Sequence, residues 1–195
     1  MRIQLTVAIV STAVMAASAL AQERSGNARA AANPMPQSAL AEFARRVSDY
    51  VELRKTLQSG LPGLTGSDDP AHVRSVELAL AERIRAARPR ARQGDIFTSE
   101  MAAAVRSILR AHMDAATLKT ILDEVPGVFP HRVNDAYPKS RPLSTMPPNV
   151  LALLPRLPDD LQYRFIGGDL VLHDTKSNLI VDRIPEAISL ATRSR

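Results

Sequence analysis

The stretch Leu161-Gln-Tyr-Arg-Phe-Ile-Gly-Gly-Asp-Leu-Val-Leu-His-Asp174 holds two runs rich in apolar residues, one on either side of Gly167-Gly168. A glycine pair in this position is a strong signal for a two-residue hairpin, because the primed turns that join antiparallel strands need positive φ and glycine has no Cβ to forbid it. With these glycines as the loop, Ile166 faces Asp169. A third run, Leu179 to Ile184, follows a polar turn, and the three runs predict a three-stranded antiparallel meander.

This register divides the side chains of the meander between two faces. One face collects Leu161, Tyr163, Phe165, Leu170 and Leu172, and the other collects Gln162, Arg164, Ile166, Asp169, Val171 and His173. An apolar face opposite a mixed one is typical of a half-buried sheet, and three strands need a cover over their apolar face. The length of the second turn is ambiguous, so the pattern leaves open whether Ile180 or Val181 points inward.

The chain upstream of the meander predicts helices that supply this cover. Apolar residues recur at three- and four-residue steps from Ser38, a candidate N-cap, to Gln58, and again after Asp69-Pro70, where Asp69 caps the helix. Two shorter helices follow, one capped by Thr98 and one beginning at Asp114. The predicted fold is α+β: an N-terminal helical hairpin and two shorter helices packed with the C-terminal three-stranded antiparallel meander.

Composition changes along the chain predict its organisation. We expect a signal peptide at 1–21, a disordered leader at 22–37, a helical region at 38–125, a proline-rich ordered wrap at 126–160, and the meander with its tail at 161–195. The wrap holds eight prolines together with apolar residues that a solvated linker does not carry. One helical turn is expected at Pro148 to Leu154 and a short helix at Pro185 to Ala191. Residues 38–191 are expected to form a single domain.

The N-terminus predicts export. Arg2 precedes an almost wholly apolar run, Leu5 to Ala17, and Ala19-Leu-Ala21 fits the small-x-small rule for cleavage after Ala21. The mature protein is therefore expected to be periplasmic or secreted, with no stable membrane insertion once the signal peptide is removed. An uncleaved membrane anchor is the alternative, since the apolar run is near the lower limit for spanning a bilayer.

Charge and composition narrow the classes of partner. The chain has 195 residues, no cysteine and a formal net charge of +5. Without cysteine there are no disulfides, so stability must come from an ordinary core. In an exported protein a basic surface favours an anionic envelope component or a protein over nucleic acid, although a solvated surface with mild excess charge is also compatible. The basic run Arg83 to Arg92 is either an anion-binding segment or a helix end whose dipole favours cations, followed by a basic loop.

No motif in the chain points to catalysis. The patterns His-Glu-x-x-His and Gly-x-Ser-x-Gly are absent, as is the glycine spacing of phosphate-binding and dinucleotide-binding loops, and no cofactor is predicted. Folding could still gather side chains from distant parts of the chain into a metal site. The candidate metal ligands are His131, Asp135, His173 and Asp174.

Four segments of the chain resemble an uncharacterised family of exported bacterial proteins. They are Gly94-Asp-Ile-Phe-Thr98, Pro142-Leu-Ser-Thr-Met-Pro-Pro-Asn149, Tyr163-Arg-Phe-Ile-Gly167 and Leu179-Ile-Val-Asp182, and the likeness covers most of the mature chain. This resemblance implies no known activity or catalytic residue. The meander alone is also similar to the small β-unit that ends the nickel/cobalt-homeostasis periplasmic proteins. The glycine usual in the second turn there is Asn178 here, and nothing about metals carries over.

Three functional hypotheses follow from these patterns. The first is an exported non-enzymatic protein that binds a protein or cell-envelope partner, because export and a full core pattern come without a catalytic motif. The second is a periplasmic metal-binding or stress protein that uses His131 and His173 with nearby carboxylates. The third is a hydrolase whose site is assembled only in three dimensions.

Overall fold

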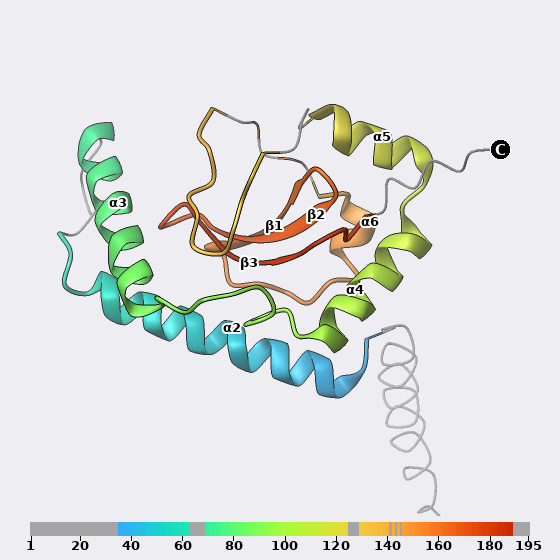
Figure 1. The fold of residues 1–195 in the computed structure, drawn as a ribbon, viewed down its shortest axis with the longest axis horizontal. Helices are drawn as coiled ribbons and strands as arrows, with labels where there is room; N and C mark the ends of the chain where they lie inside the picture. The colour runs from blue at the N-terminus through green and yellow to red at the C-terminus, as the bar shows by residue number, and fades with distance from the viewer. Residues whose placement is uncertain are drawn as a thin grey trace, which may run out of the picture. The chain divides into compact units, whose positions relative to one another are not determined.

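The computed structural model describes residues 35–62, 69–124, 129–140, 142, 144 and 146–188. The predicted signal peptide, most of the predicted leader and residues 189–195 lie outside this part of the chain. The described residues from Met35 onward belong to one compact unit. Its helices are α2 (Gln37–Gln58), α3 (Pro70–Ala87), α4 (Ser99–His112), α5 (Ala115–Glu124) and α6 (Pro148–Leu151), and its strands are β1 (Leu161–Ile166), β2 (Asp169–Asp174) and β3 (Leu179–Ile184) (Figure 1). The predicted α+β fold is confirmed.

Side-chain oxygens begin three of the helices where the sequence predicted. Asp69, Thr98 and Asp114 each accept a hydrogen bond from a backbone N–H in the first turn of α3, α4 and α5, respectively. These bonds satisfy donors that the start of a helix leaves unpaired. The prediction that Ser38 caps the first helix was wrong, because α2 already begins at Gln37 and has no side-chain cap. The Ser38 hydroxyl instead donates to Glu100 on α4 at 3.2 Å.

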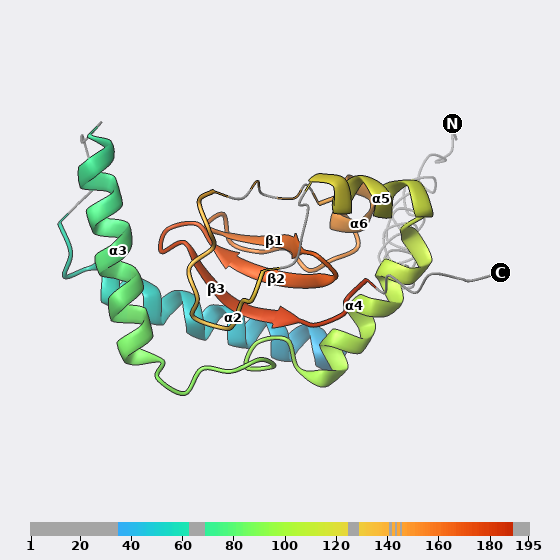
Figure 2. The same cartoon turned by 45° about the horizontal axis from the view of Figure 1, so that its top comes forward.

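Helices α2 and α3 follow each other closely, but α3 lies at a steep angle to α2 and meets it with its C-terminal end, instead of lying along it as a hairpin would (Figures 1 and 2). The buried side chains of α3 are Val76, Leu80, Ala81 and Ile84, so its first turn is not packed. Arg83 fixes the crossing, since its guanidinium donates to the backbone carbonyls of Leu57 and Gly60 at 2.9 and 3.0 Å. These carbonyls belong to the C-terminal end of α2, where a cation is favoured.

The sheet has the order β1-β2-β3 and the predicted register of its first hairpin, with Ile166 opposite Asp169. Only the first glycine of the turn takes the predicted positive φ, at 56° for Gly167. The prediction that Gly168 also has a positive φ was wrong. Glycine is required there for a different reason, because a Cβ on Gly168 would lie 2.9 Å from the carbonyl oxygen of Ile188.

A bulge in β3 determines where Ile180 and Val181 point, which the sequence pattern left open. His173 is opposite Ile180 and Leu172 is opposite Asp182, so Val181 is the extra residue. Both Ile180 and Val181 are fully buried, and they belong to different apolar clusters. Both point inward because both faces of the sheet are covered.

The helices cover one face of the sheet and form the main core with it. The largest fully buried side chains of this core include Phe43 of α2, Ile84 of α3, Met101 of α4 and Phe165 of β1. The predicted apolar face, namely Leu161, Tyr163, Phe165, Leu170 and Leu172, lies wholly in this core. The helices therefore provide the cover that the meander required.

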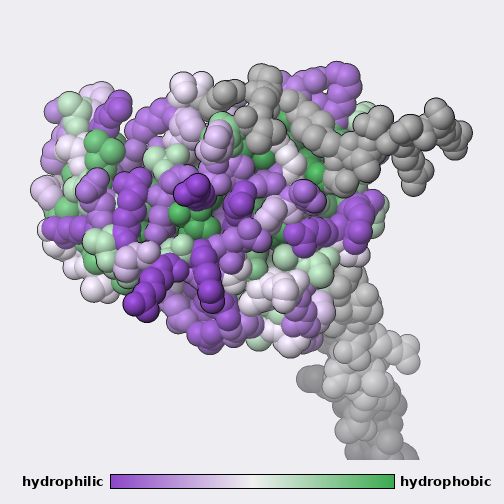
Figure 3. Space-filling view, in the orientation of Figure 1, coloured by the Kyte–Doolittle hydropathy of each residue, from purple (hydrophilic) through white to green (hydrophobic). Residues whose placement is uncertain are grey.

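The mixed face of the sheet lies under the described residues of 129–144, which we call the strap. Its backbone pairs with the free edge of β3: the N–H of Asn134 donates to Ile180 at 2.8 Å, and the N–H of Tyr137 donates to Asn178 at 2.9 Å. A second apolar cluster lies beneath it, formed by Tyr137, Ile166, Val171 and Ile180. Figure 1 shows the strap in front of the sheet, and hydrophilic side chains predominate on this side of the molecule (Figure 3).

The predicted helix at Pro185 to Ala191 was wrong for its described part, residues 185–188, which form a turn and a bend. Glu186 has φ 48°, which a right-handed helix does not tolerate. The N–H of Glu186 donates to Asp169 at 2.9 Å, and the N–H of Ile188 donates to Gly168 at 3.0 Å. Across the described ranges, no helix is both long and apolar enough to cross a membrane.

Candidate functional site

The structure places the four candidate metal ligands among separate partners. His131 contacts Asp169, and His173 contacts Asn178. Asp135 accepts a hydrogen bond from a backbone N–H in its own turn, and Asp174 is bound by two side chains of α2. In the part of the chain that the structure describes, no group of three or more histidine and acidic side chains could hold a metal ion.

His131 holds the strap to the sheet. Its Nδ1 lies 2.8 Å from the carbonyl oxygen of Phe129, and its Nε2 lies 3.0 Å from Oδ2 of Asp169. Both partners are acceptors, so only the doubly protonated ring can donate to both. The hydrogen bond to Asp169 raises the pKa of His131 accordingly. Arg183 donates to the same carboxylate at 2.8 Å, which makes a charged cluster of strap, β2 and β3.

A buried ion pair joins α2 to the end of β2. Arg54 is 3% exposed and donates to Asp174 at 3.1 Å and to Asp160 at 2.9 Å. The hydroxyl of Tyr50 donates to the same Asp174 carboxylate at 2.6 Å, and burial raises the pKa of that phenol. A buried charge pair of this kind fixes geometry, because removing either partner leaves the other charge unpaired.

Asp182 is a second buried carboxylate, and no motif in the sequence predicts it. It lies in β3 on the helix-covered face and accepts four backbone N–H bonds, from Gly94, Ile96, Phe97 and Arg183, at 2.7 to 2.9 Å. Burial raises the pKa of the carboxyl group, while these donors favour its charged form. The only available signal was an acidic residue within an apolar strand. Its role is to bind the loop that leads into α4.

The basic run Arg83 to Arg92 is spread over several partners. Arg85 donates to the backbone carbonyl of Asn134 at 3.0 Å, and the guanidinium of Arg88 lies over the ring of Tyr50, 5.2 Å from its centroid. A small pocket of about 360 Å³ opens beside Arg88. Its lining residues include Arg45, Arg46 and Arg88 but also Asp49 and Asp95, so opposite charges lie side by side in it.

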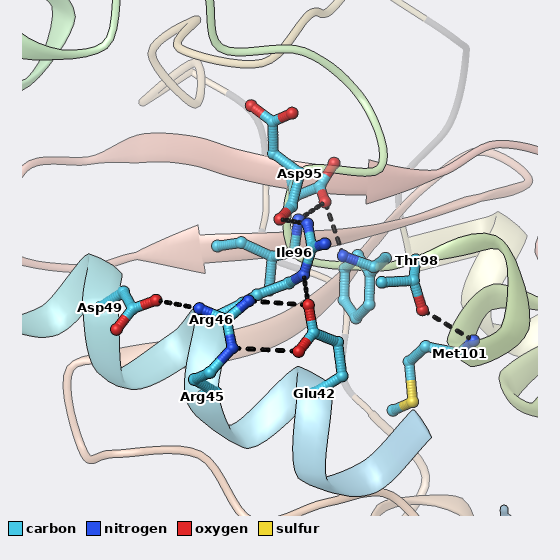
Figure 4. A network of polar contacts seen from close by, with 10 residues as sticks. Glu42, Arg45, Arg46, Asp49, Asp95, Ile96, Thr98 and Met101 are labelled. Atoms are coloured by element: carbon cyan, nitrogen blue, oxygen red, sulfur yellow. Dashed lines mark hydrogen bonds and ion pairs between the residues drawn. The ribbon is translucent and has the colours of Figure 1, made fainter. Parts of the chain in front are cut away.

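Figure 4 shows how the polar side of that pocket is built. The carboxylate of Glu42 accepts a hydrogen bond from Arg45 at 2.7 Å and one from Arg46 at 2.6 Å. Both bonds lower the pKa of Glu42, to about 2, and the bond from Arg45 has the larger effect. Arg45 also reaches Asp49, and Arg46 donates to the backbone carbonyl of Asp95 at 2.6 Å. The guanidinium groups are therefore already bound, and an anion would have to displace Glu42.

A hollow larger than the pocket at Arg88 lies beside β1, and we call it the β1 groove. It has a volume of about 780 Å³ and runs between β1 and the segment that contains α6. Its lining residues are Met146, Pro148, Leu151, Ala152, Pro155, Arg156, Leu157, Asp159, Leu161, Gln162, Tyr163 and Arg164. Most of them are apolar, and the polar ones come from the turn before β1 and from β1 itself.

Two features make the β1 groove suited to binding. Leu151 lines it with 48% of its surface exposed, so an apolar side chain in the groove is open to a ligand. Arg156 and Asp159 are exposed at its rim, and neither side chain has a hydrogen-bond or ion-pair partner within the described ranges. The hydroxyl of Tyr163 donates to the carbonyl of Pro155 at 3.0 Å and so fixes the far wall.

No protein-family model matches the chain, and no curated protein or solved structure does either. The sequence predicted the wrap and one of its helical turns, but not the groove. The available signal was the series of leucines from Leu151 to Leu157, which is more apolar than one turn of helix needs.

Proposed function

We propose that this chain is an exported, non-enzymatic protein that binds a segment of a partner protein in the β1 groove. The observation that carries the proposal is an apolar hollow of about 780 Å³ with an exposed leucine, Leu151, on its wall. Concave sites with apolar walls and a few polar groups are the usual binding sites of proteins. The predicted export signal at the N-terminus supports a role in the cell envelope or outside the cell.

The charges at the rim of the β1 groove favour a protein partner over an anionic envelope polymer. Arg156 and Asp159 both lie there, so the rim carries both signs of charge. Steering of a polyanion needs an excess of one sign.

A selection of peptides tests the binding role. The probe is the tightest-binding octapeptide obtained from random sequences displayed on phage, with the purified mature protein as target. Affinity is then measured by fluorescence anisotropy for wild type, Leu151→Asp and Leu78→Asp. Leu78 is a matched control, because it is 52% exposed on α3 and does not line the groove.

Burying a leucine against a ligand contributes about 1.5–3 kcal/mol, so Leu151→Asp should weaken binding at least about tenfold. The Leu78→Asp variant should bind as wild type does. If no peptide can be selected, or if both variants bind the peptide as tightly as wild type, the groove is not the binding site. Export is tested separately by fractionating cells and sequencing the mature N-terminus, which should begin at Gln22.

A further inference from the structure

The free edge of β1 lies at the β1 groove, since residues 161–164 of this strand line it. β1 is an edge strand, paired only with β2. In an antiparallel ladder, alternate residues bond to the neighbouring strand and the others point away from it. Ile166 and Asp169 close the two-residue turn, so Gln162, Arg164 and Ile166 bond to β2. The N–H of Phe165 confirms this alternation, because it donates outward to the hydroxyl of Ser144 at 2.6 Å.

Two contacts occupy this edge on either side of one residue. At one end the hydroxyl of Ser144 binds both backbone groups of Phe165: it accepts a hydrogen bond from the N–H at 2.6 Å and donates one to the carbonyl oxygen at 3.2 Å. At the other end the N–H of Leu161 donates to the carbonyl of Pro158 at 2.9 Å. Between them lies Tyr163, which lines the groove. Its outward N–H and C=O have no hydrogen-bond partner in the described part of the chain.

We propose that the occupant of the β1 groove is an extended peptide segment that pairs with the backbone of Tyr163. This inference rests on the proposed function and names its ligand class. The segment accepts a hydrogen bond from the N–H of Tyr163 and donates one to its C=O, which is strand addition limited to a single position. Ser144 and Pro158 block the neighbouring positions, so a longer ladder cannot form on this edge.

The geometry also specifies the side chains of the segment. The residue opposite Tyr163 places its side chain on the same face of the sheet as Tyr163, which is the face where Val150 of α6 packs. That residue should be apolar. Arg156 and Asp159 at the rim favour an acidic and a basic residue in the flanking parts of the segment. A lipid or a polysaccharide offers no N–H and C=O at the spacing of a strand.

Backbone amide exchange tests the pairing. The experiment uses the ¹⁵N-labelled mature protein and measures hydrogen exchange by NMR, first alone and then saturated with the octapeptide selected above. In the free protein the amides of Gln162, Arg164 and Phe165 should be protected, while that of Tyr163 should exchange rapidly. With the peptide bound, exchange at Tyr163 should slow at least about tenfold.

A second readout uses the ligand. Each amide of the octapeptide is N-methylated in turn, which removes one donor without changing a side chain. One position should lose at least about tenfold in affinity, because only one peptide N–H reaches the C=O of Tyr163. If the peptide binds in a manner sensitive to Leu151→Asp, but Tyr163 exchange is unchanged or already slow without peptide, strand pairing is wrong and the groove still binds. If no such peptide exists, the proposed function and this inference both fail.

Discussion

Replacing Asp182 by asparagine should destabilise the protein strongly although the side-chain shape is conserved. The carboxylate is fully buried and accepts four backbone N–H bonds, two at each oxygen. An asparagine keeps one acceptor oxygen and turns an NH₂ group toward the other two donors. Two of the four backbone N–H groups then lose their partners inside the core.

The size of the effect follows from those two groups. Leaving one buried donor unsatisfied costs about 1–3 kcal/mol, so two give about 2–6 kcal/mol. A neutral amide is easier to bury than a carboxylate, which offsets part of this cost, and we expect a net loss of about 3 kcal/mol in the free energy of unfolding. For a protein of this length each kcal/mol lowers Tm by about 2–4 °C, so Asp182→Asn should melt about 6–12 °C below wild type.

Urea unfolding followed by far-ultraviolet circular dichroism measures the change, since the chain has no tryptophan for fluorescence. Asp135→Asn is the matched control, because Asp135 is exposed and accepts one backbone N–H, from Arg132 at 2.7 Å. It should lose less than about 1 kcal/mol. A loss at Asp182 no larger than that at Asp135 would refute the assignment of the four bonds.

Three further changes have definite expected outcomes. Gly167→Val should destabilise by about 1 kcal/mol or more, because a β-branched residue resists positive φ, and an unchanged Tm would contradict the turn. Gly168→Ala should also destabilise, by about 1–3 kcal/mol, because its Cβ meets a backbone oxygen, and a stability equal to wild type would show that the contact is not tight. The hydrogen bond to Asp169 raises the pKa of His131 in the folded protein. The charged imidazolium therefore stabilises the fold below its ordinary pKa of 6.5, and this stabilisation is lost as pH rises through the higher pKa of the folded state. Unfolding free energies between about pH 6 and pH 9 should fall more steeply for wild type than for His131→Gln, and equal slopes would exclude the charged contact.

The sequence predicted what depends on neighbouring residues. The glycine pair determined the register of β1 and β2 because turn and strands are contiguous, and Asp69 and Thr98 marked helix starts because a cap acts within one turn. The bulge at Val181 lies between two residues that contact segments far away along the chain: Ile180 pairs with the strap, and Asp182 binds the loop before α4. No local pattern records it, and the choice between Ile180 and Val181 stayed open for that reason.

The candidate site was harder to predict than the fold. In the sequence Arg54 is one of several charged residues of the first helix, and nothing distinguishes it from the others. Its partners Asp160 and Asp174 come close to it only in the folded chain. The histidines suggested a metal site because their partners could not be foreseen, and His131 proved to lie between two acceptors. The β1 groove forms where the segment around α6 passes β1, and a wall built from two distant segments has no motif.

The measurement that tests the central claim most directly is site-specific photo-crosslinking in the cells that make this protein. Benzoylphenylalanine is placed at position 151 in the β1 groove or at position 78 on α3, replacing leucines that are exposed to a similar extent, 48% and 52%. Position 151 should give an adduct of discrete mass that the selected octapeptide suppresses in permeabilised cells, and position 78 should give none. Equal labelling at both positions, or no adduct at position 151, would contradict a partner-binding groove.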